Sequence, residues 1–312
     1  VIIISLTLSA ILVFFIVPLT ILFFIYLSNI LLLIYQRNSE VKADPLSDVW
    51  DSARRAIAGF WDIYARVWHG YELHGVENLP EGPGILVYYH GAIPVDYLYF
   101  MSRLFLWKKR LCLSVADHFV FRLPGLKLLL EVTGVMPGTR EECLIALKNG
   151  HLVSISPGGV REALFSNESY QLVWGNRKGF AQVALDAKVP IIPMYTQNVR
   201  EGYRMFKERK IFRQLYESTR LPLTPPYGGL PVKLRTYIGE PIPYDPNITT
   251  EELVEKVVKW LYCCSCISRS VKATFFCFFQ TKTAIQALIS KHQTIPGSIW
   301  KALLERFDKR CK

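Results

Sequence analysis

The sequence predicts an α/β fold: a mostly parallel central sheet flanked by helices, with an N-terminal transmembrane helix or helical hairpin. Short apolar runs rich in Val, Ile and Tyr alternate with helical segments from residue 71 onward, an order typical of parallel sheets. The first 35 residues contain no charged side chain. As a helix they would extend about 52 Å, beyond the roughly 30 Å of hydrocarbon that a membrane span must cross.

Composition limits the classes of function. The chain has 312 residues, 51% of them hydrophobic, and a net charge of +11. A basic surface favours anionic lipids or phosphate-bearing ligands. Nucleic acid is the competing partner, but the sequence shows no basic recognition helix, zinc-ligand spacing or aromatic RNA-binding motif. We therefore expect no nucleic acid among the partners.

The seven cysteines predict neither a disulfide framework nor a metal site. Their number is odd, and the cluster Cys263-Cys264-Ser265-Cys266 has no second ligand pair at zinc spacing. We therefore expect a reducing compartment. S-acylation of the cluster is an alternative use of its thiols.

Residues 1–36 are expected to form a membrane anchor, either one tilted helix kinked at Pro18 or a hairpin of two short segments. A signal peptide is disfavoured because its apolar core would be shorter. The basic residues that follow place the next domain in the cytosol by the positive-inside rule. They are Arg37, Lys42, Arg54 and Arg55. Glycosylation tripeptides at Asn167 and Asn247 favour the lumen instead, and we give the charges more weight.

Residues 37–70 are interpreted as an amphipathic interfacial helix and linker. Apolar positions recur every three or four residues between Trp50 and Trp68, as in a helix that buries one face. The aromatic side chains suit a bilayer interface. Ordinary packing against the domain is the alternative.

Residues 71–262 show the alternation that defines the fold class. Strands are expected at 71–80 (a strand and turn), 84–89, 110–116, 152–156, 189–195 and 232–237. Helices are expected at 94–104, 119–130, 141–148, 179–187 and 250–262. Residues 263–312 are expected to form a C-terminal helical extension with helices at 283–291 and 299–307, after a Cys- and Phe-rich insert at 263–280 that no periodicity places.

One strand end carries the first candidate for chemistry. The strand over 84–89 ends at His90. Pro94 then suits the first turn of a helix, and Asp96 lies in that turn. If Asp96 folds back onto the imidazole, the pair has the layout of a base that deprotonates a hydroxyl. The alternatives are a histidine that is only hydrogen-bonded and an acidic residue placed by the helix dipole.

Two further segments end at the same edge of the predicted sheet. Pro157-Gly158-Gly159 stops one strand, and Gln197-Asn198 follows another. Reactive groups gather beyond the C-terminal strand ends of such folds. Basic and aromatic residues then alternate from Arg200 to Arg213. This stretch is interpreted either as a helix that meets phosphates or lipid head groups or as a solvated helix face.

Four motifs follow one another along the chain: His90 with Asp96, Gly134 with Arg140, residues 157–162, and residues 189–193. This order resembles the four blocks of the glycerolipid acyltransferase superfamily, which includes the lysophosphatidate acyltransferases. Five residues separate His90 from Asp96, where the family usually has four. The third block reads Ser-Pro-Gly-Gly-Val-Arg-Glu in place of Phe-Pro-Glu-Gly-Thr-Arg-Ser. That block and residues 177–180 are closer to the branch of diacylglycerol acyltransferase 2 and the monoacylglycerol acyltransferases.

The resemblance implies that residues 71–262 are an acyltransferase catalytic domain on the endoplasmic-reticulum membrane. His90 would take the proton from a lipid hydroxyl, and Asp96 would orient the imidazole. Acyl-CoA would be a co-substrate, and neither a bound cofactor nor a metal is implied. The substrate-binding residues that the resemblance implies are Gly134, Arg140, Pro157, Gly158, Gly159, Arg161 and Glu162.

The resemblance also implies individual roles. Backbone amides near Gly158 and Gly159 would stabilise an oxyanion, and Arg140 would contact phosphate or coenzyme A. Arg161 and Glu162 would either bind substrate or form a structural ion pair with each other. No Gly-x-Ser-x-Gly elbow is present, which argues against a serine hydrolase that forms an acyl-enzyme.

The identity of the acceptor depends on one substitution. The family's third-block glutamate is replaced by Gly158, which favours a neutral mono- or diacylglycerol acceptor and triacylglycerol as the product. A lysophospholipid acyltransferase is the first alternative, and a non-catalytic lipid-binding protein is the second. The expected partners are the lipid bilayer, acyl-CoA and a glycerolipid acceptor.

Overall fold

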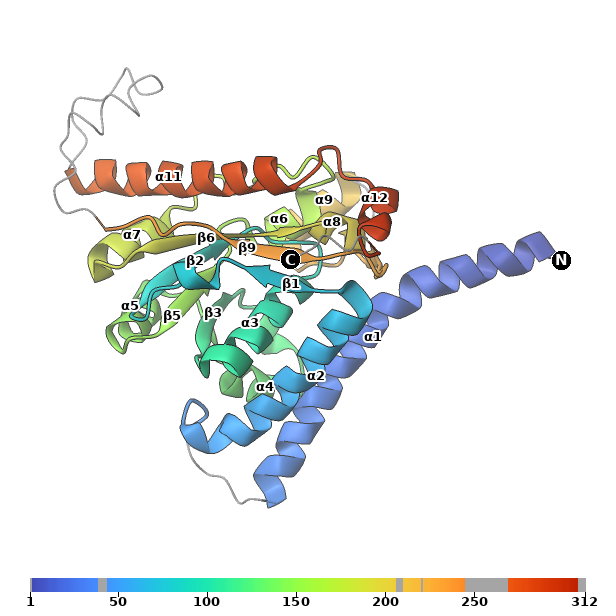
Figure 1. The fold of residues 1–312 in the computed structure, drawn as a ribbon, viewed down its shortest axis with the longest axis horizontal. Coiled ribbons are helices and arrows are strands. Elements are labelled where there is room, and N and C mark those ends of the chain that lie inside the picture. The colour runs from blue at the N-terminus through green and yellow to red at the C-terminus, as the bar shows by residue number, and fades with distance from the viewer. Residues whose placement is uncertain (1, 39–43, 206–209, 220, 245–268, 308–312) are drawn as a thin grey trace.

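The computed structural model describes residues 2–38, 44–205, 210–219, 221–244 and 269–307. Figure 1 shows one sheet with helices on both faces. One face is covered by α5 (Arg140–Lys148), α7 (Gly179–Ala187) and α11 (Arg269–His292). The other is covered by α2 (Asp51–His69), α3 (Val95–Lys108) and α4 (Lys127–Val132), beside the long helix α1 (Ile2–Asn38).

Among the described residues, the sheet has seven strands in the order β1-β9-β6-β2-β5-β3-β4. Their bounds are β1 Glu72–His74, β2 Gly84–Tyr88, β3 Cys112–Ala116, β4 Val135–Pro137, β5 Leu152–Ile155, β6 Ile191–Gln197 and β9 Arg235–Ile238. Every neighbouring pair is parallel except β6 and β9. The predicted α/β fold with a mostly parallel sheet is therefore confirmed. A separate antiparallel pair joins β7 (Tyr203–Met205) to β8 (Pro226–Gly228).

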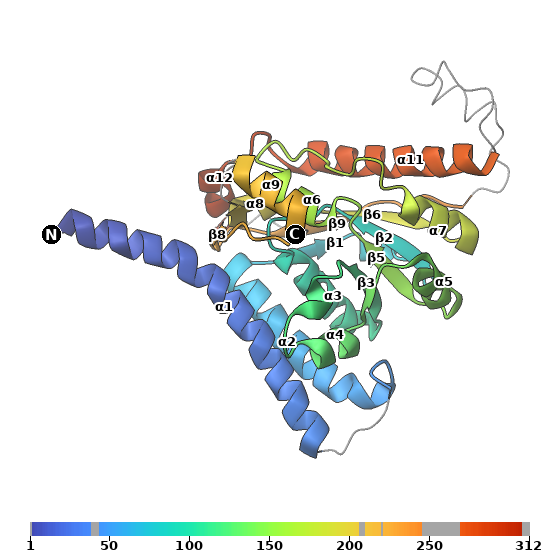
Figure 2. The same ribbon diagram turned by 180° about the vertical axis from the view of Figure 1, so that it is seen from behind.

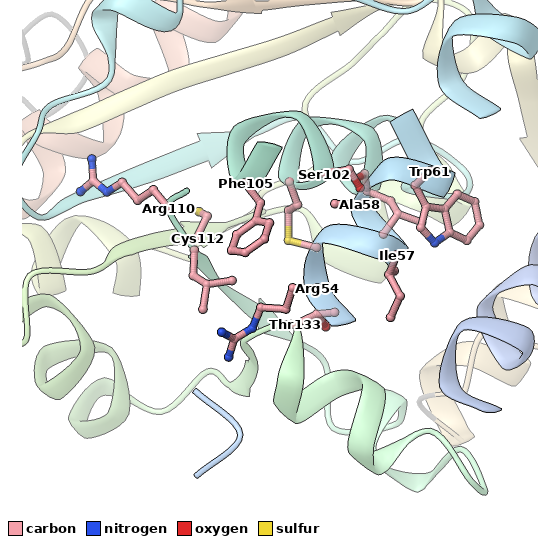
Figure 3. A pocket seen from close by; sticks show the side chains of 12 residues that line it. Arg54, Ile57, Ala58, Trp61, Ser102, Phe105, Arg110, Cys112 and Thr133 are labelled. Carbon is pink, nitrogen blue, oxygen red and sulfur yellow. The ribbon is translucent and has the colours of Figure 1, made fainter. Parts of the chain in front are cut away.

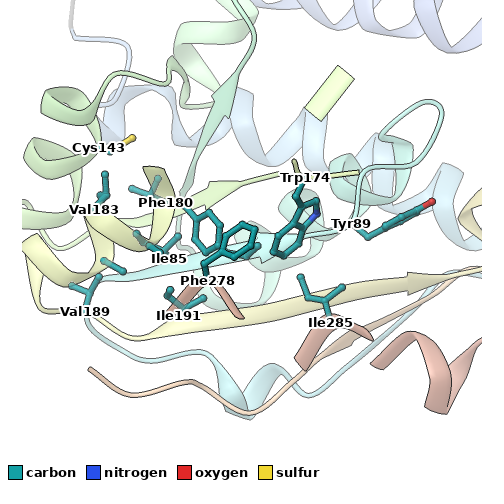
Figure 4. Close-up of a cluster of buried hydrophobic side chains, with 14 of the residues drawn as sticks. Ile85, Tyr89, Cys143, Trp174, Phe180, Val183, Val189, Ile191, Phe278 and Ile285 are labelled. Carbon is teal, nitrogen blue, oxygen red and sulfur yellow. The ribbon is translucent and has the colours of Figure 1, made fainter. Parts of the chain in front are cut away.

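The largest core cluster lies between the sheet and the helices α5, α7 and α11. Figure 4 shows Phe180 and Phe278 packed against Trp174, with Ile285 close to the sheet. The ring centroids of Trp174 and Phe278 are 5.7 Å apart, and those of Phe180 and Phe278 are 6.0 Å apart. Helix α11 therefore belongs to the core of the α/β unit and is not an appendage to it.

Helix α11 corrects the prediction for the C-terminal region. Residues 269–280 were expected to belong to an insert without periodicity, yet they form the first half of a continuous 24-residue helix. The periodicity is hidden because both Phe276 and Phe278 are buried, so apolar residues do not mark one narrow face. The helix expected at 250–262 and the cluster of Cys263, Cys264 and Cys266 lie outside the described residues.

Helix α2 forms where the apolar periodicity predicts it. Ala53, Ile57, Trp61 and Ala65 are buried along one face. The helix ends at Gly70, which adopts a left-handed φ of 52° and donates its N–H to the Arg66 carbonyl, a common way to end a helix.

Helix α1 is one continuous helix that passes through Pro18, so the hairpin alternative is wrong. Its stretch Pro18–Asn38 is long and apolar enough to cross a membrane. Phe24 of α1 packs edge-on against Phe60 and Trp61 of α2, with ring centroids 5.2 and 6.4 Å apart. Figures 1 and 2 show that the N-terminal half of α1 projects away from the sheet.

Two other predicted helices are broken in the structure. The helix expected at 119–130 is interrupted at Pro124-Gly125, where Gly125 has a φ of 75°; it becomes η3 (Val120–Arg122) and α4. The basic helix expected at 200–213 becomes the short α8 (Val199–Gly202), β7 and then α9 (Lys210–Thr219). The other helices in the described part of the chain are η1 (Asp48–Trp50), η2 (Val76–Asn78), α6 (Gly159–Phe165) and α12 (Ile299–Leu304).

Candidate active site

Three adjacent central strands deliver the candidate residues to one edge of the sheet. Strand β2 pairs in parallel with β5 on one side and β6 on the other. The segments that follow these strands therefore emerge side by side at their carboxyl ends. They carry His90 after β2, Pro157-Gly158-Gly159 after β5 and Arg200 after β6.

His90 presents a neutral imidazole. Its Nδ1 lies 2.7 Å from the Gly91 carbonyl oxygen, which only accepts hydrogen bonds, so Nδ1 carries the proton and Nε2 keeps its lone pair. Burial and the nearby Arg200 charge lower the pKa of His90 to about 4, although the Gly91 carbonyl opposes this shift. A neutral imidazole with a free Nε2 lone pair is the form that a general base requires.

The expected hydrogen bond between His90 and Asp96 is not formed. Asp96 is buried, and its Oδ1 has no hydrogen-bond partner among the described residues. Burial raises the pKa of Asp96 to about 6, and a hydrogen bond with Thr196 opposes this shift. The direct pairing is therefore wrong for this structure. The His90 Nδ1–H donates instead to the Gly91 carbonyl. Gly91 lies in the loop between His90 and Asp96, which is one residue longer than the family pattern.

Asp96 instead joins a buried network between α3 and the strands β6 and β9. The Thr196 hydroxyl lies 2.8 Å from the Thr236 hydroxyl, which accepts a hydrogen bond of 2.9 Å from Tyr71. Through Thr196 this network holds the Asp96 carboxyl at the start of α3. Asp96 thus helps to place the helix that follows the His90 loop.

Glu162 binds the backbone of His90. It lies in α6, is fully buried, and accepts the His90 N–H at 2.9 Å through Oε2 and the Val173 N–H at 3.0 Å through Oε1. Burial raises its pKa to about 7, whereas both backbone donors and the Arg200 charge oppose this shift. The predicted ion pair with Arg161 is wrong, because Arg161 Nη2 binds Glu217 at 2.9 Å instead.

Arg200 binds the same backbone from the other side. It is 2% exposed, and its Nη2 donates to the His90 carbonyl at 2.9 Å and also to the Glu162 carbonyl. Its Nε donates to the Tyr89 hydroxyl at 2.8 Å, and its Nη1 to the Ala163 carbonyl at 2.9 Å. Arg200 therefore cannot act as the exposed phosphate ligand that its place in a basic stretch suggested. The other basic residues of that stretch, apart from Arg204, have side chains outside the described set.

Two glycines allow these close approaches. A Cβ on Gly91 would lie 2.4 Å from Cγ2 of Val199, beside Arg200. A Cβ on Gly158 would lie 2.4 Å from Cβ of Glu162 and 2.6 Å from its Oε2. Both glycines are thus required by packing around His90.

The third motif lines this edge with backbone groups. Arg177 donates through Nη1 to the carbonyl of Pro157 at 3.3 Å and to that of Gly158 at 3.0 Å. The N–H of Gly159 donates to the Ser156 hydroxyl at 3.3 Å. Arg177 is exposed and was not among the predicted site residues, although it begins the stretch that resembles the diacylglycerol acyltransferase 2 branch.

The second motif lies apart from these contacts. Gly134 adopts a φ of 77°, and a Cβ there would lie 2.7 Å from Leu113, so its role in the structure is a turn before β4. Arg140 donates from Nε and Nη2 to Asp186 at 3.0 and 2.6 Å. No hydrogen bond or ion pair among the described residues joins Arg140 to the surroundings of His90.

An apolar pocket lies on the α3 side of the sheet. It is formed by α2, α3, β3 and the end of α4, and Figure 3 shows Trp61 and Ile57 at one end and Phe105 and Cys112 at the other. Leu98 and Met101 of α3 also line it, one turn beyond Asp96. Within the described ranges no group of three His, Cys, Asp or Glu side chains is arranged to hold a metal.

Comparison with known proteins identifies the family. A curated protein of Gallus gallus named "DGAT1/2-independent enzyme synthesizing storage lipids" is 61% identical over 265 residues, which cover 85% of this chain and 73% of that protein. The human protein of the same name is 55% identical over 275 residues, covering 88% of this chain and 78% of that protein. The chain belongs to the glycerolipid acyltransferase superfamily.

The acyltransferase family's own sequence model matches residues 70–197, which span β2, His90, the third motif and β6. Among solved structures, the 1-acyl-sn-glycerophosphate (LPA) acyltransferase PlsC from Thermotoga maritima is 18% identical with a TM-score of 0.44, covering 69% of this chain and 80% of that chain. The region that the family model matches in this chain contains the strands whose ends carry the candidate site.

Proposed function

We propose that this acyltransferase is a membrane-bound enzyme that moves a fatty acyl group from acyl-CoA to the hydroxyl of mono- or diacylglycerol, with triacylglycerol as the final product. The observation that carries the proposal is the neutral His90 imidazole, whose Nε2 lone pair is left available by the Nδ1 contact with Gly91. The names of the chicken and human relatives, which refer to storage lipids, support the choice of product class.

The proposed reaction is a direct transfer. The acceptor hydroxyl gives its proton to Nε2 of His90 while its oxygen attacks the thioester carbonyl carbon. The tetrahedral intermediate collapses, the C–S bond breaks, and the imidazolium returns the proton to the leaving thiolate of coenzyme A. Protons and bonds balance with one base and no covalent enzyme intermediate.

Residues of the third motif suit two supporting roles in this reaction, which are stabilisation of the oxyanion and binding of coenzyme A. Pro157, Gly158 and Gly159 supply backbone groups at the strand end next to His90. We assign oxyanion stabilisation to Gly158, because the Gly159 N–H already donates to Ser156. Arg161, Arg177 and Arg140 are exposed or half-exposed cations and suit the phosphates of coenzyme A. Glu162 and Gly134 shape the protein and are not assigned to the substrate.

The apolar pocket is suited to a fatty chain. It opens between α2 and α3 and is lined mainly by apolar side chains, among them Ile57, Trp61 and Phe105. Helix α3 begins in the loop of His90 and also supplies part of the pocket wall.

Membrane association is supported by α1 and α2 together. The stretch Pro18–Asn38 has the length and composition of a span. Phe60, Ile63 and Val67 lie on one stripe of α2 and are 37%, 59% and 70% exposed, as expected of a helix that rests in a bilayer interface. We assign the endoplasmic-reticulum membrane from the family resemblance, and we assign the α/β unit to the cytosol from the basic residues at and after the end of α1.

The experiment is an acceptor competition. The full chain is reconstituted in phosphatidylcholine vesicles with labelled oleoyl-CoA, and diacylglycerol and lysophosphatidate are offered together. Preferential labelling of triacylglycerol supports the proposal. Preferential labelling of phosphatidate would favour the lysophospholipid acyltransferase, and labelling of neither lipid would favour a non-catalytic lipid-binding protein.

A further inference from the structure

Both backbone polar groups of His90 are held by buried charged side chains from distant parts of the chain. The N–H donates to Glu162 at 2.9 Å, across 72 residues. The carbonyl accepts from Arg200 at 2.9 Å, across 110 residues. Glu162 is fully buried and Arg200 is 2% exposed, so neither contact exchanges freely with water.

We propose that Glu162 and Arg200 form a charged clamp that fixes the His90 backbone and so aims the imidazole at the acceptor hydroxyl. The proposal rests on the proposed function, because it assigns positioning residues to the base of that reaction. Neither residue touches the substrate in this account. Each acts through the peptide groups of His90.

The charges of the clamp compensate one another. A buried ion without a partner is strongly disfavoured, and here the carboxylate and the guanidinium are bridged by the His90 peptide groups and by the bond from Arg200 to the Glu162 carbonyl. Charge-assisted hydrogen bonds are roughly twice as strong as neutral ones. The arrangement therefore restricts the His90 backbone more firmly than an ordinary strand end.

Surrounding residues fix the clamp itself. The Tyr89 hydroxyl accepts from Arg200 Nε and lies 2.6 Å from the Ser166 hydroxyl. The second Glu162 oxygen is occupied by the Val173 N–H at 3.0 Å. Because all these partners are backbone groups or buried hydroxyls, the side chains of Glu162 and Arg200 are held in a single conformation.

The test uses Glu162→Gln and Arg200→Gln in the full chain, assayed in vesicles with labelled oleoyl-CoA and diacylglycerol. A glutamine at 162 replaces one acceptor oxygen by a donor that faces a backbone N–H. We expect kcat to fall about 10- to 100-fold in each variant while KM for the acyl donor stays within about 3-fold, because misplacement of a reacting group by about 1 Å has effects of this size. The double variant should lose less than the product of the two single losses.

The pH profile separates positioning from general destabilisation. The charged and titratable groups in contact with His90 are Tyr88, Glu162 and Arg200. Loss of the Arg200 charge should move the acidic limb of kcat/KM to higher pH, and Arg200→Lys should restore its position. Because burial raises the pKa of Glu162 to about 7, its carboxyl is already neutral at the pH of this limb, so Glu162→Gln should lower kcat and leave the limb in place. A purely structural defect would not separate the two variants in this way.

Arg103→Gln is the matched control. Arg103 of α3 is also buried, at 6% exposed. It donates to Asp62 at 2.9 Å and to the Tyr71 carbonyl at 3.1 Å, and neither bond involves His90. It should lower the melting temperature and leave kcat within about 3-fold. The relevant clamp variants are those whose melting temperature is at or above that of Arg103→Gln. If their kcat also stays within about 3-fold of the unaltered protein, the clamp proposal is overturned.

Two further variants keep the outcome decisive. If a clamp variant does not fold, Tyr89→Phe removes the hydroxyl that accepts from Arg200 Nε and contacts Ser166, and an unchanged kcat there would overturn the proposal. His90→Ala is measured beside them. Activity in His90→Ala would refute the proposed function and the clamp together, whereas inactive His90→Ala with fully active clamp variants would refute the clamp alone.

Discussion

Gly158 and Glu162 approach so closely that a Cβ on Gly158 would lie 2.4 Å from Cβ of Glu162 and 2.5 Å from its carboxyl carbon. Both residues belong to the third motif, one helical turn apart at the start of α6. The Glu162 carboxylate reaches the His90 N–H across the space that this glycine leaves. The position that differs most from the family pattern is therefore explained by packing as well as by substrate chemistry.

Gly158→Ala is expected to displace Glu162 from His90. Activity should fall about 10-fold or more, and overpacking should lower the free energy of unfolding by about 1–3 kcal/mol. Initial rates in vesicles and melting in detergent measure the two effects. Gly59→Ala is the control: it lies within α2 with nothing within 4 Å of its Cβ position, and it should stabilise the helix by up to about 1 kcal/mol. Equal effects of the two variants would contradict the packing account.

Filling the apolar pocket should shorten the preferred acyl chain. Ala58 and Ser102 line the pocket from α2 and α3 and are buried, so Ala58→Phe and Ser102→Leu reduce its length. The ratio of octanoyl-CoA to oleoyl-CoA turnover should rise about 10-fold, since a few methylenes in an apolar pocket differ by about 1–3 kcal/mol. Val67→Phe, on the exposed stripe of α2, is the control. An unchanged ratio of octanoyl-CoA to oleoyl-CoA turnover in all three variants would show that the acyl chain does not bind in this pocket.

The ion pair of Arg140 and Asp186 offers a test of coenzyme A binding. The two side chains are 57% and 24% exposed, so the pair adds little stability. If Arg140 contacts the coenzyme A phosphates of the acyl donor, Arg140→Ala should raise KM for acyl-CoA about 5-fold or more. Asp186→Asn, which releases the guanidinium, should leave this KM equal or lower. A rise of the same size in both variants would assign Arg140 a structural role only.

His69 predicts how stability depends on pH. It is fully buried, with Nδ1 at 3.1 Å from the Val232 carbonyl, and burial lowers its pKa to about 4. Since the unfolded chain takes up this proton first, stability falls as pH drops from about 6.5 to 4. His69→Asn can keep a donor to Val232 but does not titrate.

Between pH 7 and pH 5 this variant should lose about 2 kcal/mol less of its unfolding free energy than the unaltered chain. Asp96 and Glu162, whose raised pKa values act in the opposite sense, are present in both proteins and cancel in the comparison. His118→Asn, at an exposed position, is the control. Parallel pH curves for His69→Asn and the unaltered chain would refute the assignment.

The sequence predicted those parts of the fold that depend on short-range patterns. The strand before His90 is an uninterrupted apolar run, and all five residues of β2 are buried. The helix over 179–187 was predicted at its observed bounds. Helix α5 begins with a capping box of Thr139 and Glu142, which local sequence encodes.

The contacts around His90 could not be predicted in the same way. Arg200 stands in a stretch of basic residues, which suggests a solvated face, but its burial depends on carbonyls supplied by His90, after β2, and by Ala163 of α6. Likewise, Asp96 was expected to bind the imidazole because they are close in sequence, whereas Thr196 on β6 holds its carboxyl. Such partners are determined by the strand order, which places β6 beside β2. No local sequence pattern predicts that order.

If His90 is the base of a direct acyl transfer, its removal from the folded protein should nearly abolish the reaction. His90→Ala is reconstituted in vesicles beside the unaltered chain, with folding verified by its melting temperature, and the transfer of labelled oleate from oleoyl-CoA to diacylglycerol is followed. The account predicts a loss of about 100-fold or more, the size of a general-base contribution. Transfer at the unaltered rate by folded His90→Ala would contradict it.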